Sequence, residues 1–247
     1  RRLNKRMHVN KIDNLKEYQR YLEDNDQEVQ NLFREFLIEV TSFFREPESF
    51  DFLKEKILPE IMKRRKSGES IRIWVPGCST GEESYSLAIL FREYMEENKE
   101  FYIIQLFATD VDHDVIEKAR SGVYPDSIAT DISEERLKKY FRRQNSTYQV
   151  NREIREMIVF AVQNVIKDPP FTRLDLISCR NLLIYLTSDV QKKLLRVFHY
   201  SLRNEGFLSL GSSESVSSNP ELFDQVERQK KVFRKKEISQ ELRQELE

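Results

Sequence analysis

Two glycines and two glutamates stand close together in the stretch VPGCSTGEESYSLA, at residues 75–88. An apolar run, IRIWV, leads into the glycines, so the sequence predicts a buried strand, a turn and the start of a helix. Gly77 and Gly81 allow the backbone to turn tightly and to approach a ligand closely. This order of elements is typical of nucleotide sites, in which the ligand lies beyond the carboxyl ends of the strands.

The two glutamates indicate which kind of nucleotide the turn suits. Glu82 and Glu83 fall in the first turn of the expected helix, where carboxylates favour the helix dipole but repel a pyrophosphate. The turn also lacks the Lys-Ser/Thr ending of a phosphate-binding loop and the third glycine of a dinucleotide fingerprint. A phosphate-free nucleoside with hydroxyls or a positive charge fits better, and S-adenosylmethionine offers both. The alternative is that the two carboxylates only cap the helix.

A further carboxylate, Asp110 in FATDVDHD, follows the next apolar run, residues 102–108. An acidic residue at the end of the second strand commonly accepts hydrogen bonds from a ribose. Such acids are frequent in α/β proteins, so Asp110 carries weight only together with the glutamates. The combination favours an S-adenosylmethionine-dependent methyltransferase over a nicotinamide-dependent oxidoreductase.

The elements that must position these residues alternate between strands and helices after residue 69. This alternation predicts an α/β fold with a mainly parallel sheet, covered on both faces and closed by an antiparallel hairpin. The strands are expected at residues 71–75, 102–108, 157–162, 174–178 and 207–210, the hairpin at 223–226 and 231–234, and the helices at 82–97, 114–120, 133–141 and 190–202.

Before residue 69 the pattern is helical, with apolar residues at helical spacing from about residue 12 to residue 66. Pro47 opens a separate helix, and Gly68 suits a helix end. We therefore expect three regions, namely a helical N-terminal domain and linker at residues 1–68, a methyltransferase catalytic domain at 69–236, and a charged tail or connector at 237–247.

Composition limits the remaining function classes. The net charge of −1 gives no argument for nucleic acid or an anionic membrane as a partner. No apolar stretch reaches the roughly 20 residues of a membrane span, and no apolar segment follows the basic start as in a signal peptide, so we expect a cytoplasmic protein without membrane insertion. Cys78 and Cys179 suit a reduced chain, and three scattered histidines argue against a metal site.

Four stretches in a fixed order make the assignment more specific. They are VTSFFREPESF, GCSTGEESYSLA, ATDVDHDVIEKARSGVY and SCRNLLIYL, at residues 40–50, 77–88, 108–124 and 178–186. From about residue 6 to residue 235 the chain resembles the CheR-type chemotaxis receptor methyltransferases, and most of all the CheR modules of multidomain sensor proteins. The resemblance implies a class I, Rossmann-like methyltransferase domain preceded by a small all-α domain.

The resemblance also implies roles for particular residues. Thr41 and Arg45 would reach the cofactor from the helical side, although Glu39 stands where family members often have Asn. Arg45 and Tyr185 are expected to act in catalysis, by steering the substrate carboxylate and by shaping the methyl-transfer pocket. The residues expected to bind the cofactor are Thr41, Arg45, Gly77, Glu83, Asp110, Asn164, Val165, Arg180 and Asn181.

Each of these residues also has a purely structural interpretation. Arg45 could pair across a turn, Asn164 is a common turn residue, and Tyr185 lies among leucines and isoleucine as a core aromatic would. The ordered set of motifs, rather than any single residue, favours the functional interpretation.

The activity implied is methyl esterification of glutamate side chains on the cytoplasmic helices of chemoreceptors, with S-adenosylhomocysteine as product. The alternative is a non-catalytic module that senses S-adenosylmethionine within a larger signalling protein. Basic residues crowd the first 20 positions and could recognise acidic receptor helices, or merely form a solvated helix face. The segment RRQNSTYQVN, residues 142–151, is short and has no glycine, so we do not expect it to tether a receptor tail peptide.

Overall fold

The computed structural model describes residues 2–36 and 41–238, and the chain divides into two compact units, Arg1–Val40 and Thr41–Glu247. The division falls inside the stretch that the sequence assigned to one helical domain, residues 1–68. The physical reason is that apolar residues after Pro47, among them Phe50 and Ile57, belong to the core of the second unit.

The first unit consists of three short helices, α1 (Arg2–Val9), α2 (Leu15–Glu23) and α3 (Asp26–Phe36). Asn14 caps α2 by accepting a hydrogen bond from the backbone N–H of Lys16. A buried carboxylate, Glu28 on α3, accepts hydrogen bonds from Arg6 on α1 and Tyr18 on α2, so one polar cluster joins all three helices.

The second unit is built on a seven-stranded sheet, which confirms the predicted α/β fold with a mainly parallel sheet and an antiparallel closing hairpin. Its strands stand in the order β6-β2-β1-β7-β8-β10-β9. The pairs β8–β10 and β10–β9 are antiparallel, and the other pairs of neighbours are parallel. The strands are β1 (Ser70–Pro76), β2 (Ile103–Asp110), β6 (Ile158–Val162), β7 (Leu174–Cys179), β8 (Leu202–Leu210), β9 (Phe223–Glu227) and β10 (Val232–Lys235).

The chain leaves β1 toward β2 and β6 on one side and later returns to β7 and β8 on the other side. The order of strands therefore reverses between β1 and β7. In open α/β sheets this switch point is where loops diverge and a ligand can bind beyond the carboxyl ends of the strands.

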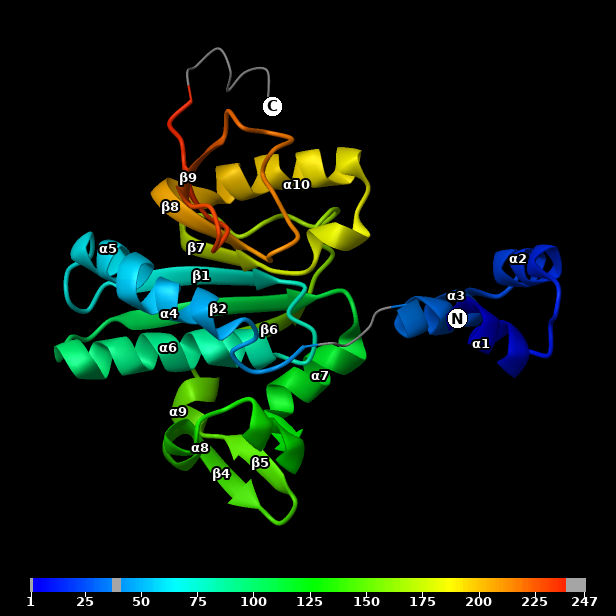
Figure 1. Ribbon diagram of the computed structural model, residues 1–247, viewed down its shortest axis with the longest axis horizontal. Coiled ribbons are helices and arrows are strands. Elements are labelled where there is room, and N and C mark those ends of the chain that lie inside the picture. Colours follow the sequence, from blue (N-terminus) through cyan, green and yellow to red (C-terminus); the bar gives the residue numbers. More distant parts are fainter. Residues whose placement is uncertain (1, 37–40, 239–247) are drawn as a thin grey trace. The chain divides into compact units, whose positions relative to one another are not determined.

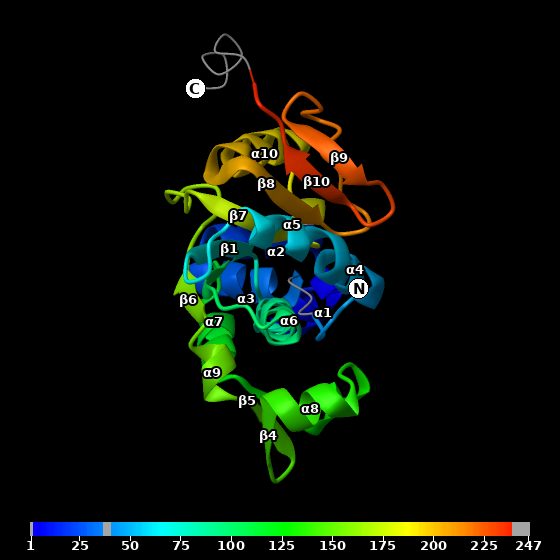
Figure 2. The same ribbon diagram turned by 90° about the vertical axis from the view of Figure 1, so that its left-hand side faces the viewer.

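Helices cover the two faces of the sheet unequally (Figures 1 and 2). One face packs against a core that includes Phe50, Ile57 and Tyr85, and the other packs against Phe198 of a single long helix. The first face is covered by α4 (Pro47–Phe52), the π-helical turn η1 (Leu53–Ile57), α5 (Leu58–Lys63), α6 (Glu82–Asn98) and α7 (His113–Ser121), and the second by α10 (Ser188–Ser201).

A small antiparallel sheet is inserted between α7 and β6 and projects from the main sheet (Figure 1). It contains β3 (Val123–Pro125), β4 (Phe141–Gln144) and β5 (Thr147–Val150), with η2 (Asp126–Thr130), α8 (Glu134–Tyr140) and α9 (Arg152–Arg155) around it. Asn145 takes the left-handed conformation, φ +52°, in the tight turn between β4 and β5. Asn tolerates this conformation better than most residues, so the turn needs no glycine.

Candidate functional site

The glycine turn lies between β1 and α6, at the switch point of the sheet. Gly77 has φ +68° and Gly81 has φ +94°, conformations that favour glycine. A Cβ on Gly77 would lie 3.1 Å from the Leu182 side chain, and one on Gly81 would lie 3.0 Å from Ala119 Cβ. Both glycines therefore allow the turn to pack closely against neighbouring protein segments, in addition to setting its curvature.

Asp110, the last residue of β2, is joined directly to this turn. Its Oδ2 accepts a 2.9 Å hydrogen bond from the backbone N–H of Ser79, and its Oδ1 accepts one of 3.1 Å from Asp112. Burial raises the pKa of the Asp110 carboxyl, and these N–H donors oppose the rise. Each carboxylate oxygen retains a second lone pair, with which it can accept a ribose hydroxyl.

The structure separates the roles of the two adjacent glutamates. The Thr80 hydroxyl lies within hydrogen-bond distance of both carboxylate oxygens of Glu82, at 2.8 and 2.7 Å, so Glu82 stabilises the glycine turn itself. Glu83 instead accepts a 2.7 Å hydrogen bond from Ser178 on β7, across the switch point. Burial raises the pKa of Glu83, whereas the Arg180 charge and the Ser178 hydroxyl lower it. Glu83 is thus the glutamate that lies at the switch point.

Arg180, directly after β7, organises a second loop of the site. Its Nη2 donates to the backbone carbonyl of Arg45 at 2.7 Å and to Glu46 Oε2 at 2.9 Å. Glu46, which is left-handed with φ +59°, also accepts a 2.9 Å hydrogen bond from Ser212. The side chain of Arg180 is 1% exposed, and its guanidinium lies over the Phe50 ring. Arg180 therefore fixes the loop that carries Arg45.

The segment before Arg45 is anchored to the start of α6. The backbone N–H of Phe44 donates to Ser86 Oγ at 2.9 Å, and the Phe43 ring packs edge-on against Tyr124. Burial has the larger effect on the pKa of Glu83 and raises it, and the positive charge of Arg45 opposes this rise.

Thr41 and Glu39 are the other residues that the resemblance assigned to this side of the site. Thr41 is half-buried at the start of the second unit, to which Arg45 also belongs. Both residues therefore belong to the second unit rather than to the three-helix unit. Glu39 lies outside the described residues.

The loop after β6 lies beside Asp110, because the backbone N–H of Gln163 donates to the Asp110 carbonyl at 2.9 Å. Asn164 Oδ1 accepts hydrogen bonds from the backbone N–H groups of Ile166 and Lys167, at 3.0 and 3.3 Å. The oxygen of Asn164 thus caps its own loop, as the structural interpretation predicts. Val165 is half-buried against the core that contains Phe198.

The turn after β7 brings the remaining expected residues to the same end of the sheet. Asn181 has φ +62°, and the 3-10 turn η3 (Leu183–Tyr185) begins two residues later. Tyr185 is 54% exposed, so it does not occupy the core as its apolar neighbours suggested. Sequence reasoning did not identify Glu214, whose carboxylate binds this turn; the only sequence signal was its place in the polar stretch GSSES after β8.

The buried polar atoms that have no hydrogen-bond partner among the described residues include Arg180 Nε and Ser79 Oγ, near the switch point. A buried donor without a partner is costly, so a ligand group that accepts from it is strongly favoured. A guanidinium N–H suits a carboxylate, and Asp110 suits ribose hydroxyls. The residues present therefore fit S-adenosylmethionine, which carries a carboxylate at one end and a ribose in the middle.

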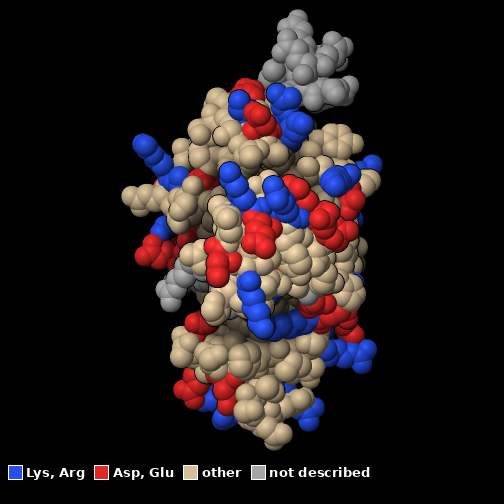
Figure 3. Space-filling model, turned by 90° about the vertical axis from the view of Figure 1, so that its right-hand side faces the viewer, with Lys and Arg blue, Asp and Glu red and all other residues tan. Residues whose placement is uncertain are grey.

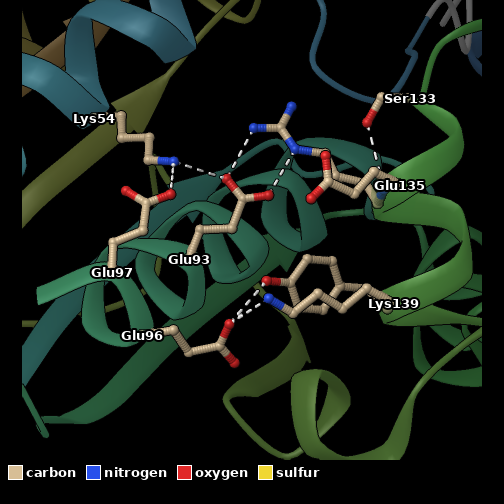
Figure 4. Close-up of a pocket in the computed structure, with 9 residues that line it drawn as sticks. Lys54, Glu93, Glu96, Glu97, Ser133, Glu135 and Lys139 are labelled. Atoms are coloured by element: carbon tan, nitrogen blue, oxygen red, sulfur yellow. Dashed lines mark hydrogen bonds and ion pairs between the residues drawn. The ribbon is translucent and has the colours of Figure 1, made fainter. Parts of the chain in front are cut away.

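A cavity of about 410 Å³ lies elsewhere, along the last turns of α6. Figure 4 shows Lys54 between Glu97 and Glu93. The ammonium of Lys54 donates to the carboxylate of Glu97 at 2.6 Å and to that of Glu93 at 3.3 Å. Arg136 of α8 also donates to Glu93, at 2.7 Å. Burial alone would raise the pKa of Glu93, but these cations outweigh it and lower the pKa. The residues that line this cavity come from η1, α6, α8 and the residue before α8, and none of them belongs to the glycine turn.

In the described part of the chain, His, Cys, Asp and Glu side chains form no group of three arranged to hold a metal ion. Among the same residues, no helix combines the length and the apolar character needed to cross a membrane.

Comparison with known families and proteins gives consistent matches. Residues 39–232 match the family described as CheR methyltransferase, SAM binding domain, and residues 1–37 match CheR methyltransferase, all-alpha domain. An uncharacterized 104.1 kDa protein of Rhodobacter capsulatus is 42% identical over 216 residues, which cover 87% of this chain but only 23% of that protein.

Two shorter relatives match over most of their own length. A chemotaxis protein methyltransferase of Borreliella burgdorferi is 34% identical over 228 residues, covering 90% of this chain and 81% of that protein. Chemotaxis protein methyltransferase 1 of Pseudomonas aeruginosa is 32% identical over 193 residues, covering 76% of this chain and 70% of that protein.

Proposed function

Because this chain belongs to the CheR methyltransferase family, we propose that it transfers methyl groups from S-adenosylmethionine to glutamate side-chain carboxylates of chemoreceptors. The substrate would be the cytoplasmic helices of the receptor, so the reaction would take place in the cytoplasm. The proposal is supported above all by the arrangement at the switch point, where Glu83, Arg180 and the Arg45 loop converge beside Asp110.

The bound cofactor supplies a methyl group on a positively charged sulfonium. Transfer of this methyl group to a glutamate carboxylate would form a neutral ester and leave a neutral thioether, so the two opposite charges would disappear together. A glutamate with its ordinary pKa of about 4.3 is already an anion at neutral pH, so no general base is needed. Positioning and exclusion of water are the contributions that remain for the protein.

We assign these contributions to residues of three segments, namely the end of β2, the loop before α4 and the turn after β7. Asp110 would accept the ribose hydroxyls, and the unpartnered Nε of Arg180 would bind the methionyl carboxylate. Arg45 would steer the substrate carboxylate, since Arg180 holds the loop that carries it beside the carboxyl end of β7. Tyr185, largely exposed on its turn, would form the wall of the methyl-transfer pocket.

Recognition of the receptor would involve the three-helix unit. Arg6 is bound to buried Glu28, so its charge is not available to a partner. Lys16 and Arg20 remain exposed, and their spacing places them on one face of α2. Among the described residues on the face in Figure 3, Lys and Arg side chains are interspersed with Asp and Glu. We therefore propose a local contact through α2 rather than attraction by a broad basic surface.

The hairpin of β4 and β5 would take no part in tethering a receptor tail peptide. Its connection is a two-residue turn, closed by the pairing of Gln144 with Thr147.

The test is methyl transfer from labelled S-adenosylmethionine to a receptor cytoplasmic fragment. We expect label that is released by mild base, as a methyl ester requires, and none on a fragment whose methylation-site glutamates are replaced by glutamine. Base-stable label would contradict esterification. Binding of S-adenosylhomocysteine without any transfer would instead support a cofactor-sensing module.

A further inference from the structure

Glu214, in the loop after β8, is a buried carboxylate that binds backbone groups from two loops. It is 3% exposed, and no described Lys or Arg forms an ion pair with it. Its Oε2 accepts from the backbone N–H of Gly211 at 2.6 Å and of Asn181 at 2.9 Å, and its Oε1 accepts from Leu183 at 2.7 Å. Three N–H donors satisfy a buried carboxylate without a cation.

The two N–H groups of Asn181 and Leu183 open the turn that carries Tyr185. Within this turn, the only backbone hydrogen bonds among the described residues are Tyr185 to Leu182, 3.2 Å, and Leu186 to Leu183, 3.0 Å. Two bonds hold such a turn weakly, because a single 3-10 turn gains little cooperativity. Glu214 supplies two further bonds from outside, so it determines where the turn lies.

The carbonyl side of the same turn is held by another side chain. Gln191 Nε2 on α10 donates to the carbonyls of Leu183 at 2.9 Å and Leu186 at 3.1 Å. The turn is therefore clamped through its N–H groups by Glu214 and through its carbonyls by Gln191.

Close packing surrounds the Glu214 carboxylate at Gly211 and joins the turn that it binds to the glycine turn. A Cβ on Gly211 would lie 2.8 Å from Glu214 Oε2 and 3.0 Å from the Asn181 nitrogen, so a side chain at this position would displace the carboxylate. Leu182, between the two clamped residues, packs on Gly77 of the glycine turn. A shift of the clamped turn would therefore move both Tyr185 and the wall of the glycine turn.

We propose that Glu214 is a positioning residue for methyl transfer, which acts by holding the turn that presents Tyr185 to the reacting atoms. The proposal rests on the proposed function. It assigns no chemistry to Glu214 itself, since within residues 2–36 and 41–238 its carboxylate accepts hydrogen bonds from backbone N–H groups only. What Glu214 supplies is the fixed backbone from which Tyr185 extends.

The first experiment compares Glu214→Gln with the native chain. An amide has one acceptor oxygen instead of two and turns an N–H donor toward a backbone donor, so at least one of the three bonds is lost. We expect turnover on a receptor fragment to fall about 30-fold, in the range that misplacement of a catalytic group produces. We also expect amide hydrogen exchange to accelerate in residues 181–186 and to stay unchanged in β1 and β2.

A matched control is Asp175→Asn, at the opposite end of β7. Asp175 is also buried, is ion-paired to Arg65 and accepts from the backbone N–H of Arg72 at 2.9 Å, so its loss lowers stability without touching the turn. Turnover of this variant should change by less than about threefold. If it falls as much as in Glu214→Gln, the effect is general destabilisation and the positioning role is wrong.

A double-mutant cycle tests whether Glu214 acts through Tyr185. In a Tyr185→Ala background the Glu214→Gln change should lower turnover by at most about threefold, because the group to be positioned is gone. An undiminished 30-fold loss in that background would overturn the proposal. If the native chain transfers no methyl at all, the proposed function fails, and hydrogen exchange still decides this inference: unchanged exchange in residues 181–186 of Glu214→Gln would overturn it.

Discussion

Ser178, the penultimate residue of β7, donates a 2.7 Å hydrogen bond to Glu83 in the first turn of α6. The bond crosses the switch point of the sheet and joins the end of β7 to the start of α6. It also distinguishes Glu83 from Glu82, whose carboxylate is bound to Thr80 within the glycine turn. The two adjacent glutamates therefore differ in their hydrogen-bond partners, and only Glu83 is bonded across the switch point.

Arg45→Ala is expected to lower turnover much more than it lowers affinity for S-adenosylhomocysteine. The guanidinium would act on the substrate carboxylate, which is absent from the binary complex, so about a 100-fold loss in turnover should accompany less than a threefold change in Kd. Steady-state kinetics and calorimetry check this, with exposed Arg142→Ala as control. Equal losses in both quantities would show that Arg45 serves cofactor binding instead.

The basic residues on α2 are expected to make the rate of receptor methylation depend on ionic strength. Replacing Lys16 and Arg20 together by alanine should reduce the decline of kcat/KM with ionic strength, because exposed charges act over only about 10 Å at 0.1 M salt. The control replaces Lys192 and Lys193, which are exposed on α10, by alanine and so removes the same amount of charge. If the native chain shows no salt dependence, α2 does not recognise the receptor electrostatically.

The buried Glu28 cluster predicts a pH-dependent stability of the three-helix unit. Hydrogen bonds from Arg6 lower the pKa of Glu28 from 4.5 to about 2, and burial raises the pKa of Tyr18 to about 12. Because the folded-state pKa of Glu28 is the lower one, its stabilisation is complete above about pH 4.5 and is lost as the pH falls toward 2. It amounts to at most about 3.5 kcal/mol, since each pKa unit corresponds to about 1.4 kcal/mol.

Glu28→Gln should therefore destabilise the three-helix unit at pH 7, with a difference from the native chain that shrinks below pH 4.5. Denaturant titrations followed by NMR signals of α1 to α3 measure it. Exposed Glu17→Gln should have no such effect. A difference that stays constant down to pH 2.5 would mean that Glu28 is not ionised through its pairing with Arg6.

Gly81→Ala is expected to lower stability by more than Gly68→Ala. Both glycines have similar φ, +94° and +87°, so alanine costs about 1–2 kcal/mol at either position. A Cβ on Gly68 meets nothing within 4 Å, whereas one on Gly81 meets Ala119 Cβ at 3.0 Å. Thermal denaturation compares the two variants. Equal losses would show that φ alone, and not close packing of the turn, requires glycine at position 81.

The main sheet could be predicted because its strands are short apolar runs that are buried on both faces. The expected strand at residues 71–75 corresponds to β1 (Ser70–Pro76), and the one at 174–178 to β7 (Leu174–Cys179). The strands β4 and β5 could not be predicted in this way. They form a small sheet with exposed polar residues, such as RRQ at 142–144, which have no apolar periodicity.

The site could be predicted in part, because parallel strands bring the residues after their carboxyl ends together. Glu83, Asp110 and Arg180 lie at one end of the sheet for this reason. The direction of each side chain depends on tertiary contacts, as with Arg180, which binds the Arg45 carbonyl. Glu214 could not be identified because its partners are backbone N–H groups, two of them more than 30 residues away, which leave no pattern in side chains.

The measurement that tests the assigned site most directly is calorimetric titration with S-adenosylhomocysteine of the native chain, Asp110→Asn and Asp112→Asn. Both variants lose one negative charge, but Asp112 caps α7, a role that asparagine fills equally well. We predict micromolar binding by the native chain and by Asp112→Asn, and at least tenfold weaker binding by Asp110→Asn, the loss expected when hydrogen bonds to a charged group are weakened. Equal affinity in all three proteins, or no binding by the native chain, would contradict a cofactor site at the carboxyl ends of β1, β2 and β7.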